Sequence, residues 1–210
     1  MGGGFVPDTG AMNPPATDAS RLQTINATFV AGTFSRNEAR SAVIQVIFDR
    51  LRCSRVSLWR FEGEPDTLRL LCFASQAEGT ELDTQERRLT AAEYRGYFNA
   101  LVRRGMYISH DAWADPTLQA MRQNYLVPNH VLSMLDAAFM VNGRAYGMVC
   151  CEQTDVLRAW RPADVAALRA IVSKLAMLMA GSGDPALWGS PSVPMAPLSP
   201  IASTAPKAPQ

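Results

Sequence analysis

Residues 125–153 read Y-L-V-P-N-H-V-L-S-M-L-D-A-A-F-M-V-N-G-R-A-Y-G-M-V-C-C-E-Q, with Asn142-Gly143 near the middle. Asn-Gly suits a two-residue type I′ turn, because both central positions of that turn need a positive φ. Apolar runs flank the dipeptide on both sides, so the stretch predicts a β-hairpin.

The position of the turn predicts which side chains share a face. Counting outward pairs Val141 with Arg144, Phe139 with Tyr146, Ala137 with Met148 and Leu135 with Cys150. Because strand residues alternate, one face carries bulky apolar side chains, namely Leu135, Ala137, Phe139, Tyr146, Met148 and Cys150. The other carries mostly small residues around one carboxylate, namely Met134, Asp136, Ala138, Ala145, Gly147, Val149 and Cys151. Since a bare buried carboxylate is costly, we predict that the first face joins the core and the second lines a cavity.

The order of several motifs resembles that of a GAF domain. They are Y-L-x-P at 125–128, S-M-L-D-A at 133–137, G-M-V-C-C-E at 147–152, R-V-S-L-W at 55–59, Y-x-x-Y-F-x-x-L at 94–101, H-D-A-x-x-D-P at 110–116 and R-A-W-x-P at 158–162. The resemblance covers about residues 20–181. His130 stands where the family usually has Gly, and Ala138 where it usually has Pro. His accepts a left-handed φ better than most residues do.

This resemblance implies an α/β (α+β) fold. A central antiparallel sheet would carry the terminal helices on one face and a pocket covered by loops and helices on the other. Residues 1–19 and 182–210 are rich in Gly, Pro, Ser and Ala, so we predict disordered ends around a domain at 20–181. The tail has little to bury beyond Leu187-Trp188.

Local signals place the elements along the chain. Leu22, Ile25 and Phe29 predict a first helix, and Ser35 with Glu38 predicts a capping box that opens a second. Further predictions are strands at 55–61, 67–75 and 106–109, a loop at 76–89, a helix opened by Thr90-x-x-Glu93 and ended by Gly105, a short helix capped by Asp115, and a long apolar helix from Pro162.

Composition excludes several classes of partner. Lys and Arg number 20 against 19 acidic residues, so there is no electrostatic reason to expect nucleic acid or an anionic membrane. No stretch of about 18 apolar residues occurs, and the start does not resemble a signal peptide. We therefore expect a cytoplasmic protein.

Asp136 leads the predicted ligand-binding residues. It would accept hydrogen bonds from a small molecule, or it is a structural acid bonded to a neighbour. Tyr94, Tyr97, Phe98, Trp113 and Tyr125 could wall the pocket with aromatic faces, or pack as ordinary core. Met134, Met121, Cys151 and Asp111 complete the set, although Asp111 also suits a turn.

No catalytic or metal motif is present. Cys53, Cys72, Cys150 and Cys151 lack metal spacing, and the two histidines are expected in loops. Within the family, the cyclic-nucleotide type carries N-K-F-D-E, the bilin type a Cys beside a His or similar partner, and the free methionine sulfoxide reductase type cysteines in its middle loops. This sequence has none of the three patterns.

The resemblance implies regulatory sensing of a small molecule in a bacterial cytoplasm, without enzyme activity. Output would pass through a homodimer formed by the terminal helices, or through a signalling partner. The alternatives are a dimerisation or docking module that binds no ligand, and a small redox enzyme of the methionine sulfoxide reductase type. The sequence identifies neither the ligand nor a cofactor.

Overall fold

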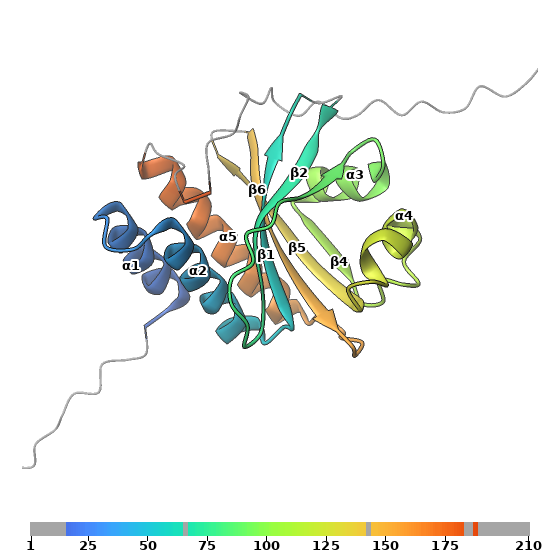
Figure 1. Ribbon diagram of the computed structural model, residues 1–210, viewed down its shortest axis with the longest axis horizontal. Helices are drawn as coiled ribbons and strands as arrows, with labels where there is room; N and C mark the ends of the chain where they lie inside the picture. The colour runs from blue at the N-terminus through green and yellow to red at the C-terminus, as the bar shows by residue number, and fades with distance from the viewer. Residues whose placement is uncertain (1–15, 65–66, 142–143, 183–186, 189–210) are drawn as a thin grey trace, which may run out of the picture.

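A six-stranded antiparallel sheet forms the centre of the computed structural model, which describes residues 16–64, 67–141, 144–182 and 187–188. The strand order is β3-β2-β1-β6-β5-β4 (Figure 1). The strands are β1 (Arg55–Glu62), β2 (Arg69–Ala77), β3 (Arg87–Thr90), β4 (Met106–Ser109), β5 (Val131–Val141) and β6 (Arg144–Thr154).

Helices cover both faces of this sheet, as Figure 1 shows. On one side lie α1 (Asp18–Val30), α2 (Arg36–Leu51) and α5 (Pro162–Ser182). On the other lie α3 (Arg95–Arg104), the 3₁₀ turn η2 (Pro116–Leu118), α4 (Gln119–Met121) and the π-helix η3 (Arg122–Leu126). The predicted fold class is therefore confirmed.

Two helix boundaries follow directly from local sequence. The Ser35 hydroxyl accepts from the Glu38 amide, and Glu38 accepts from the Ser35 amide, so the predicted capping box opens α2. Gly105 ends α3 at a φ of 67°, the left-handed conformation that glycine adopts without strain. Thr90 and Glu93 also bond to each other, but in a turn, and α3 begins only at Arg95.

The segment predicted as a loop at 76–89 contains the end of β2 and most of β3. Its residues Arg87, Arg88 and Leu89 pair with β2, although the sequence there is polar. Pairing with β2 supplies the hydrogen bonds, while only Leu89 of the three is buried, so the apolar periodicity that identifies a strand is nearly absent.

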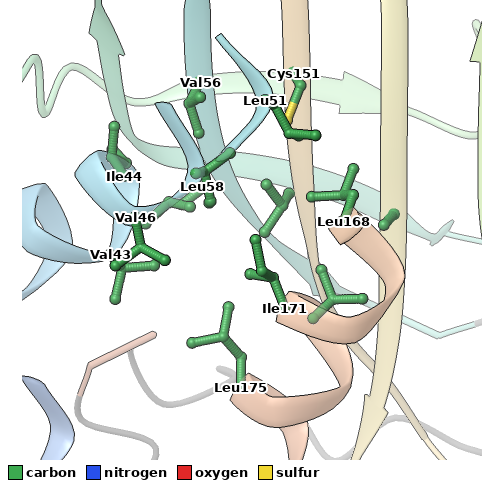
Figure 2. Packing of buried hydrophobic residues seen from close by; sticks show 14 of the residues in the cluster. Val43, Ile44, Val46, Leu51, Val56, Leu58, Cys151, Leu168, Ile171 and Leu175 are labelled. Carbon is green, nitrogen blue, oxygen red and sulfur yellow. The ribbon is translucent and has the colours of Figure 1, made fainter. Parts of the chain in front are cut away.

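Two hydrophobic cores lie on opposite faces of the sheet. The terminal-helix core joins α1, α2 and α5 to the sheet, and Figure 2 shows its packing around Val43, Leu58 and Ile171. The mid-domain core lies under α3, α4 and η3 and contains Tyr97, Phe98, Met121, Met134, Met148 and Cys150.

A β-bulge in β6 corrects the predicted hairpin register. Val141 pairs with Arg144 as expected, and Met140 pairs with Ala145, but Phe139 pairs with Gly147 rather than with Tyr146. Tyr146 is therefore the extra residue of the bulge. The predicted Asn142-Gly143 turn lies outside the described residues.

The bulge leaves the faces of β5 as predicted and exchanges most of those of β6. Leu135, Ala137 and Phe139 lie in the terminal-helix core, and Met134 and Asp136 face the mid-domain core. In β6, however, Met148 and Cys150 lie in the mid-domain core, whereas Val149 and Cys151 lie in the terminal-helix core. The physical reason is that a one-residue slip moves every later side chain to the opposite face.

Two residues of the predicted disordered tail pack into the domain. Trp188 is fully buried, and its indole Nε1 donates to the carbonyl of Trp59 at 2.8 Å. The buried Arg40 guanidinium donates to the carbonyl of Leu187 at 3.0 Å. At the other end, α1 begins at Asp18 with Thr17 as its N-cap. Predicted disorder at 1–15, 183–186 and 189–210 lies outside the described residues.

The helices of the described ranges are between three and 21 residues long. None of them combines sufficient length with sufficient hydropathy to cross a membrane.

Candidate functional site

Asp136 is fully buried in the middle of β5. The hydroxyl of Tyr97, from α3, donates to Asp136 Oδ2 at 2.7 Å and also lies 3.3 Å from the Met148 sulfur. Asp136 pairs with Tyr107 on β4 and with Cys150 on β6, so a phenol and a thiol are its neighbours across the sheet. Tyr107 turns its own hydroxyl to Asp115, at 2.8 Å.

The second oxygen of this carboxylate, Oδ1, faces fewer donors than Oδ2, and the Cys150 thiol is the hydrogen-bonding side chain beside Tyr97 that acts on the carboxyl. No described group lies in hydrogen-bonding geometry with Asp136 Oδ1, although the atom is buried. Burial raises the pKa of Asp136 to about 7, while the Cys150 thiol and the Tyr97 hydroxyl lower it. Near neutral pH the carboxyl is therefore divided between its protonated and ionised forms.

Flexible apolar side chains surround the carboxyl. Met121, Met134 and Met148 are each at most 3% exposed, and Phe98 is fully buried. Methionine is unbranched and polarizable, so it fills irregular spaces and repacks easily. These side chains share one core with Tyr97, and the methionines allow that core to repack at modest cost.

A second buried polar group lies beside Asp136. Glu152 is fully buried, accepts from the Tyr125 hydroxyl at 2.7 Å, and pairs with Arg55 at 2.5 Å. Asn129 Oδ1 accepts from Arg55 Nη1 at 3.3 Å. The negative charge of Glu152 helps to raise the pKa of Asp136, so the two carboxyls are electrostatically linked.

The Tyr125 side chain belongs to η3, whose π-helical turn is closed by the bond from the Val127 amide to the Arg122 carbonyl at 2.9 Å. Burial raises the pKa of Tyr125 well above its ordinary value, so the hydroxyl stays protonated and donates to Glu152. π-Helical turns occur frequently at functional sites. Here the turn forms a cover over the polar groups of β5 and β6.

The structure brings together six of the ten predicted site residues. Asp136, Met134, Tyr97, Phe98, Met121 and Tyr125 all line the mid-domain interior. Tyr94 and Trp113 pack at its margin and are partly buried. Asp111 is exposed, and its carboxylate accepts from the amides of Trp113 and Ala114, so it forms a turn.

The prediction that Cys151 shares a face with Asp136 is wrong, because Cys151 lies in the core on the opposite side of the sheet. Figure 2 shows its sulfur among the side chains of the terminal-helix core, near Leu51. Cys53 also lies in that core, whereas Cys72 lies in the mid-domain core. Cys53 and Cys72 therefore lie on opposite faces of the sheet, and the Cys53 thiol interacts with Cys151.

All four cysteines are free and buried. Burial is the main cause that raises the pKa of Cys72 to about 12 and that of Cys150 well above its usual range. The thiolate is the reactive form of cysteine, so these two side chains are poor nucleophiles in the folded protein.

Neither histidine belongs to a metal-binding group. His110 accepts the Trp160 amide on Nδ1 at 3.0 Å, and His130 is exposed with a φ of 52°. Within the described ranges, no three His, Cys, Asp or Glu side chains are placed to hold a metal ion. A left-handed φ at His130 explains why glycine is common at that position in the family that the sequence resembles.

Sequence reasoning missed Arg55, Glu152 and Cys150 as site residues. The signal for Glu152 was present, because a carboxylate follows four apolar residues in a strand that is buried on both faces. The register predicted for the hairpin would have placed it on the wrong face. Arg55 could be assigned only once β1 was known to pair with β6, where Arg55 lies opposite Glu152.

Comparison with known proteins agrees with this geometry. The family model for the GAF domain matches residues 35–179, while no curated protein matches the chain. The phycocyanobilin-bound GAF domain from a cyanobacterial phytochrome is 16% identical, with a TM-score of 0.61 over 80% of this chain and 97% of that chain. The blue-light absorbing form of the Thermosynechococcus elongatus PixJ GAF domain is 17% identical, with a TM-score of 0.57 over 80% of this chain and 92% of that chain.

At these identities the two structures show a shared fold, with sheet and helices in the same arrangement. The family model extends over well more than half of the 210 residues, from the capping box of α2 almost to the end of α5. The motifs of β1, α3, β5 and β6 all lie within that match. The chain belongs to the GAF domain family.

Proposed function

We propose that this chain is a regulatory domain that senses a small molecule bound beside Asp136, between the sheet and η3. The observation that carries the proposal is the fully buried Asp136 carboxyl, whose Oδ1 has no oxygen or nitrogen donor in hydrogen-bonding geometry within the described residues. A buried carboxylate oxygen without a hydrogen bond costs about 1–3 kcal/mol or more, so a donor that reaches it gains that energy on binding. A ligand donor at Oδ1 would add to the hydrogen bonds that Tyr97 and Cys150 make to this carboxyl.

The lining indicates the chemistry of such a ligand. Asp136 offers an acceptor, and the methionines around it offer polarizable apolar contact. A compact, largely apolar molecule with an N–H donor or a positive charge fits these groups. Binding of a cationic donor would favour the ionised carboxyl, and so would strengthen as the pH rises through about 7.

The two faces of β5 offer a route for the signal. Asp136 faces the mid-domain interior, while its neighbours Leu135 and Ala137 face the terminal-helix core beneath α5. If β5 and α5 move together between two positions, a ligand that binds one position more tightly shifts the equilibrium toward it. The size of the shift equals the difference in binding free energy between the two positions. Val30 on α1 and Met177 on α5 are 66% and 68% exposed, and we propose that they contact a second copy or a signalling partner.

The same proposal places the protein in a bacterial cytoplasm. The four free cysteines support this part, because free thiols persist in reducing compartments. The proposal includes no enzyme activity. The buried thiols support that view, since thiols held protonated are unreactive.

The second candidate is a dimerisation or docking module that binds no ligand. One observation favours it, namely that Met121 and Met134 are nearly unexposed and belong to the same packed core as Tyr97, the partner of Asp136. In that case a protonated Asp136 would be a structural hydrogen-bonding group for Tyr97, and the terminal helices alone would carry the function.

Native mass spectrometry of gently purified full-length protein distinguishes the two. A bound small molecule in the wild type that is lost in Asp136→Asn supports the sensor. Asp111→Asn is the matched control, because Asp111 is an exposed turn residue. A wild type that carries no added mass, together with an Asp136→Asn variant that keeps the same oligomeric state, supports the docking module and rejects the sensor.

A further inference from the structure

The outer edge of β4 is open. β4 ends the strand order of the described sheet, with β5 as its neighbour. The Ala138 amide donates to the Gly105 carbonyl at 2.9 Å, which makes Gly105 and Ala138 a hydrogen-bonded pair. Since such pairs alternate along an antiparallel ladder, the amides and carbonyls of Met106 and Ile108 point away from β5. No backbone partner is seen for these outward groups within the described residues.

A groove follows this edge. Three hollows of about 690, 360 and 470 Å³ lie along β4, and all three include Arg169 of α5. The first two also share Arg104 and Met106, and the first and third share Ile108. Because neighbouring hollows share lining residues from α3, β4 and α5, they lie next to one another along β4. We call these three hollows together the β4 groove.

The charge of the β4 groove is positive. Arg103 and Arg104 come from the last turn of α3, Arg169 comes from α5, and all three are exposed. None of these three arginines forms an ion pair within the described residues. The carboxylate of the groove, Asp115, already accepts from the Tyr107 hydroxyl and the Thr117 amide.

We propose that the β4 groove binds an extended acidic segment of a partner protein, which adds to the sheet as a strand beside β4. The outward backbone groups of Met106 and Ile108 supply the main-chain hydrogen bonds. The 42% exposed Ile108 side chain supplies an apolar contact, and the arginines pair with the carboxylates of the segment. A free phosphate would use the arginines but not the strand edge.

The chain's own segment at 189–210 does not have the composition of such a partner. Residues 189–210 are the longest stretch outside the described residues. Their sequence contains no Asp or Glu, one Lys and six Pro. Proline lacks the amide that strand addition needs, and the charge of that stretch matches that of the groove. The β4 groove is also separate from the Asp136 interior, so this inference does not rest on a ligand there.

The test is a fluorescence anisotropy titration of the full chain with a labelled peptide of about ten residues that alternates Glu and Val. Two matched peptides separate the contribution of the carboxylates from that of the main-chain hydrogen bonds. One carries Gln in place of Glu, and the other carries N-methyl groups on every second amide, which removes the donors of one edge. We expect each change to lower the affinity by about tenfold or more. Added salt should lower the affinity for the acidic peptide as well.

Variants locate the site. The double variant Arg104→Glu/Arg169→Glu should bind the acidic peptide about tenfold more weakly, because two attractive charges become repulsive. The control is Arg36→Glu/Arg88→Glu, which reverses two exposed arginines on α2 and on the opposite sheet edge. Ile108→Pro removes an outward amide without changing charge and should weaken the acidic peptide as well. Thermal unfolding of each variant checks that the fold is intact.

Four results would overturn the inference. They are no binding of the acidic peptide, equal binding of its N-methylated form, equal loss in the control variant, and displacement of the peptide by inorganic phosphate at matched ionic strength. Self-association of Arg104→Glu/Arg169→Glu without any peptide binding to the wild type would also reject it. The arginines would then only protect the edge from other copies.

Discussion

The indole of Trp188 occupies the place that a side chain on Gly147 would need. A Cβ on Gly147 would lie 2.3 Å from Trp188 Nε1 and 2.5 Å from Phe139 Cζ. The Trp188 ring packs edge-on against Phe73 and Phe139, with ring centres 5.3 and 5.0 Å apart. Gly147 follows the bulge residue Tyr146, so the irregularity of β6 and the burial of Trp188 belong to one arrangement.

Trp188→Ala should therefore destabilise the domain by about 3–5 kcal/mol, as loss of a buried aromatic side chain does. Gly147→Ala should cost about 1–3 kcal/mol, because the new methyl group overpacks this contact. Urea unfolding followed by tryptophan fluorescence and circular dichroism measures both. A Trp188→Ala variant as stable as the wild type would show that the indole does not pack there in solution.

Asp136 makes stability depend on pH. Its pKa rises from an ordinary 3.8 to about 7 in the folded protein, so between these values the folded state binds more protons than the unfolded state. The free energy of unfolding therefore falls as the pH rises through this window and levels off above about 7. Asp136→Asn removes the dependence, and its stability relative to wild type should increase by about 2–3 kcal/mol from pH 5 to pH 8.

Urea titrations at several pH values test this difference, with Asp111→Asn as the control. Asp111 is exposed in a turn, so its substitution removes a carboxylate of the same kind without touching the buried core. Parallel pH profiles for the wild type and Asp136→Asn would contradict the raised pKa.

Arg55 and Glu152 form a pair whose members depend on each other. Glu152 is fully buried, so Arg55→Leu leaves its charge uncompensated and should cost about 3–5 kcal/mol. The double variant Arg55→Leu/Glu152→Leu should cost less than the sum of the single variants, because the stranded charge disappears. A double-mutant cycle by urea unfolding measures this coupling energy.

The surface pair Arg21–Asp49 provides the comparison. Its side chains are 32% and 40% exposed, so its coupling should be about 0–1 kcal/mol. Equal coupling in the two pairs would mean that burial does not strengthen the Arg55–Glu152 interaction.

The cysteines should react only when the chain unfolds. All four are buried, and burial raises the pKa of Cys72, Cys150 and Cys151. Labelling by a disulfide reagent at about pH 8 should therefore proceed at the rate of unfolding. Rapid labelling of any of these cysteines in the native protein would instead support a redox enzyme. Assays of methionine sulfoxide reduction by the Cys150→Ser and Cys151→Ser variants would then show whether these thiols take part.

Met177 should lie in a dimer interface if the terminal helices associate. Met177→Glu places a charge on the exposed part of α5 and should shift the protein toward the monomer in light scattering after gel filtration. Leu157→Glu is the control, because Leu157 is 62% exposed in the loop after β6. A wild type that is already monomeric at high concentration would refute association through these helices.

Much of this fold could be read from local sequence. Ser35 with Glu38 and Gly105 set helix ends through their own hydrogen bonds and backbone freedom, and alternation identified the buried faces of β5. The prediction that Asp136, a carboxylate in an apolar strand, needs a polar partner is met by its burial against the Tyr97 hydroxyl. These features are visible because each depends on residues within one turn or one strand.

Other features needed the tertiary structure. The bulge at Tyr146 moved Cys151 away from Asp136 and brought Cys150 and Glu152 toward it, and polar β3 formed by pairing with β2. Arg55 meets Glu152, and Trp188 meets Gly147, only because strands and tail distant in the chain lie side by side. Short-range preferences in the sequence determined the start of α2 at Ser35, the end of α3 at Gly105 and the buried acid, while the fold class followed from the order of the motifs that resemble a family. Packing between distant segments decided the register of β6 and the partners of that acid, since the free energy of such contacts depends on the whole assembled core.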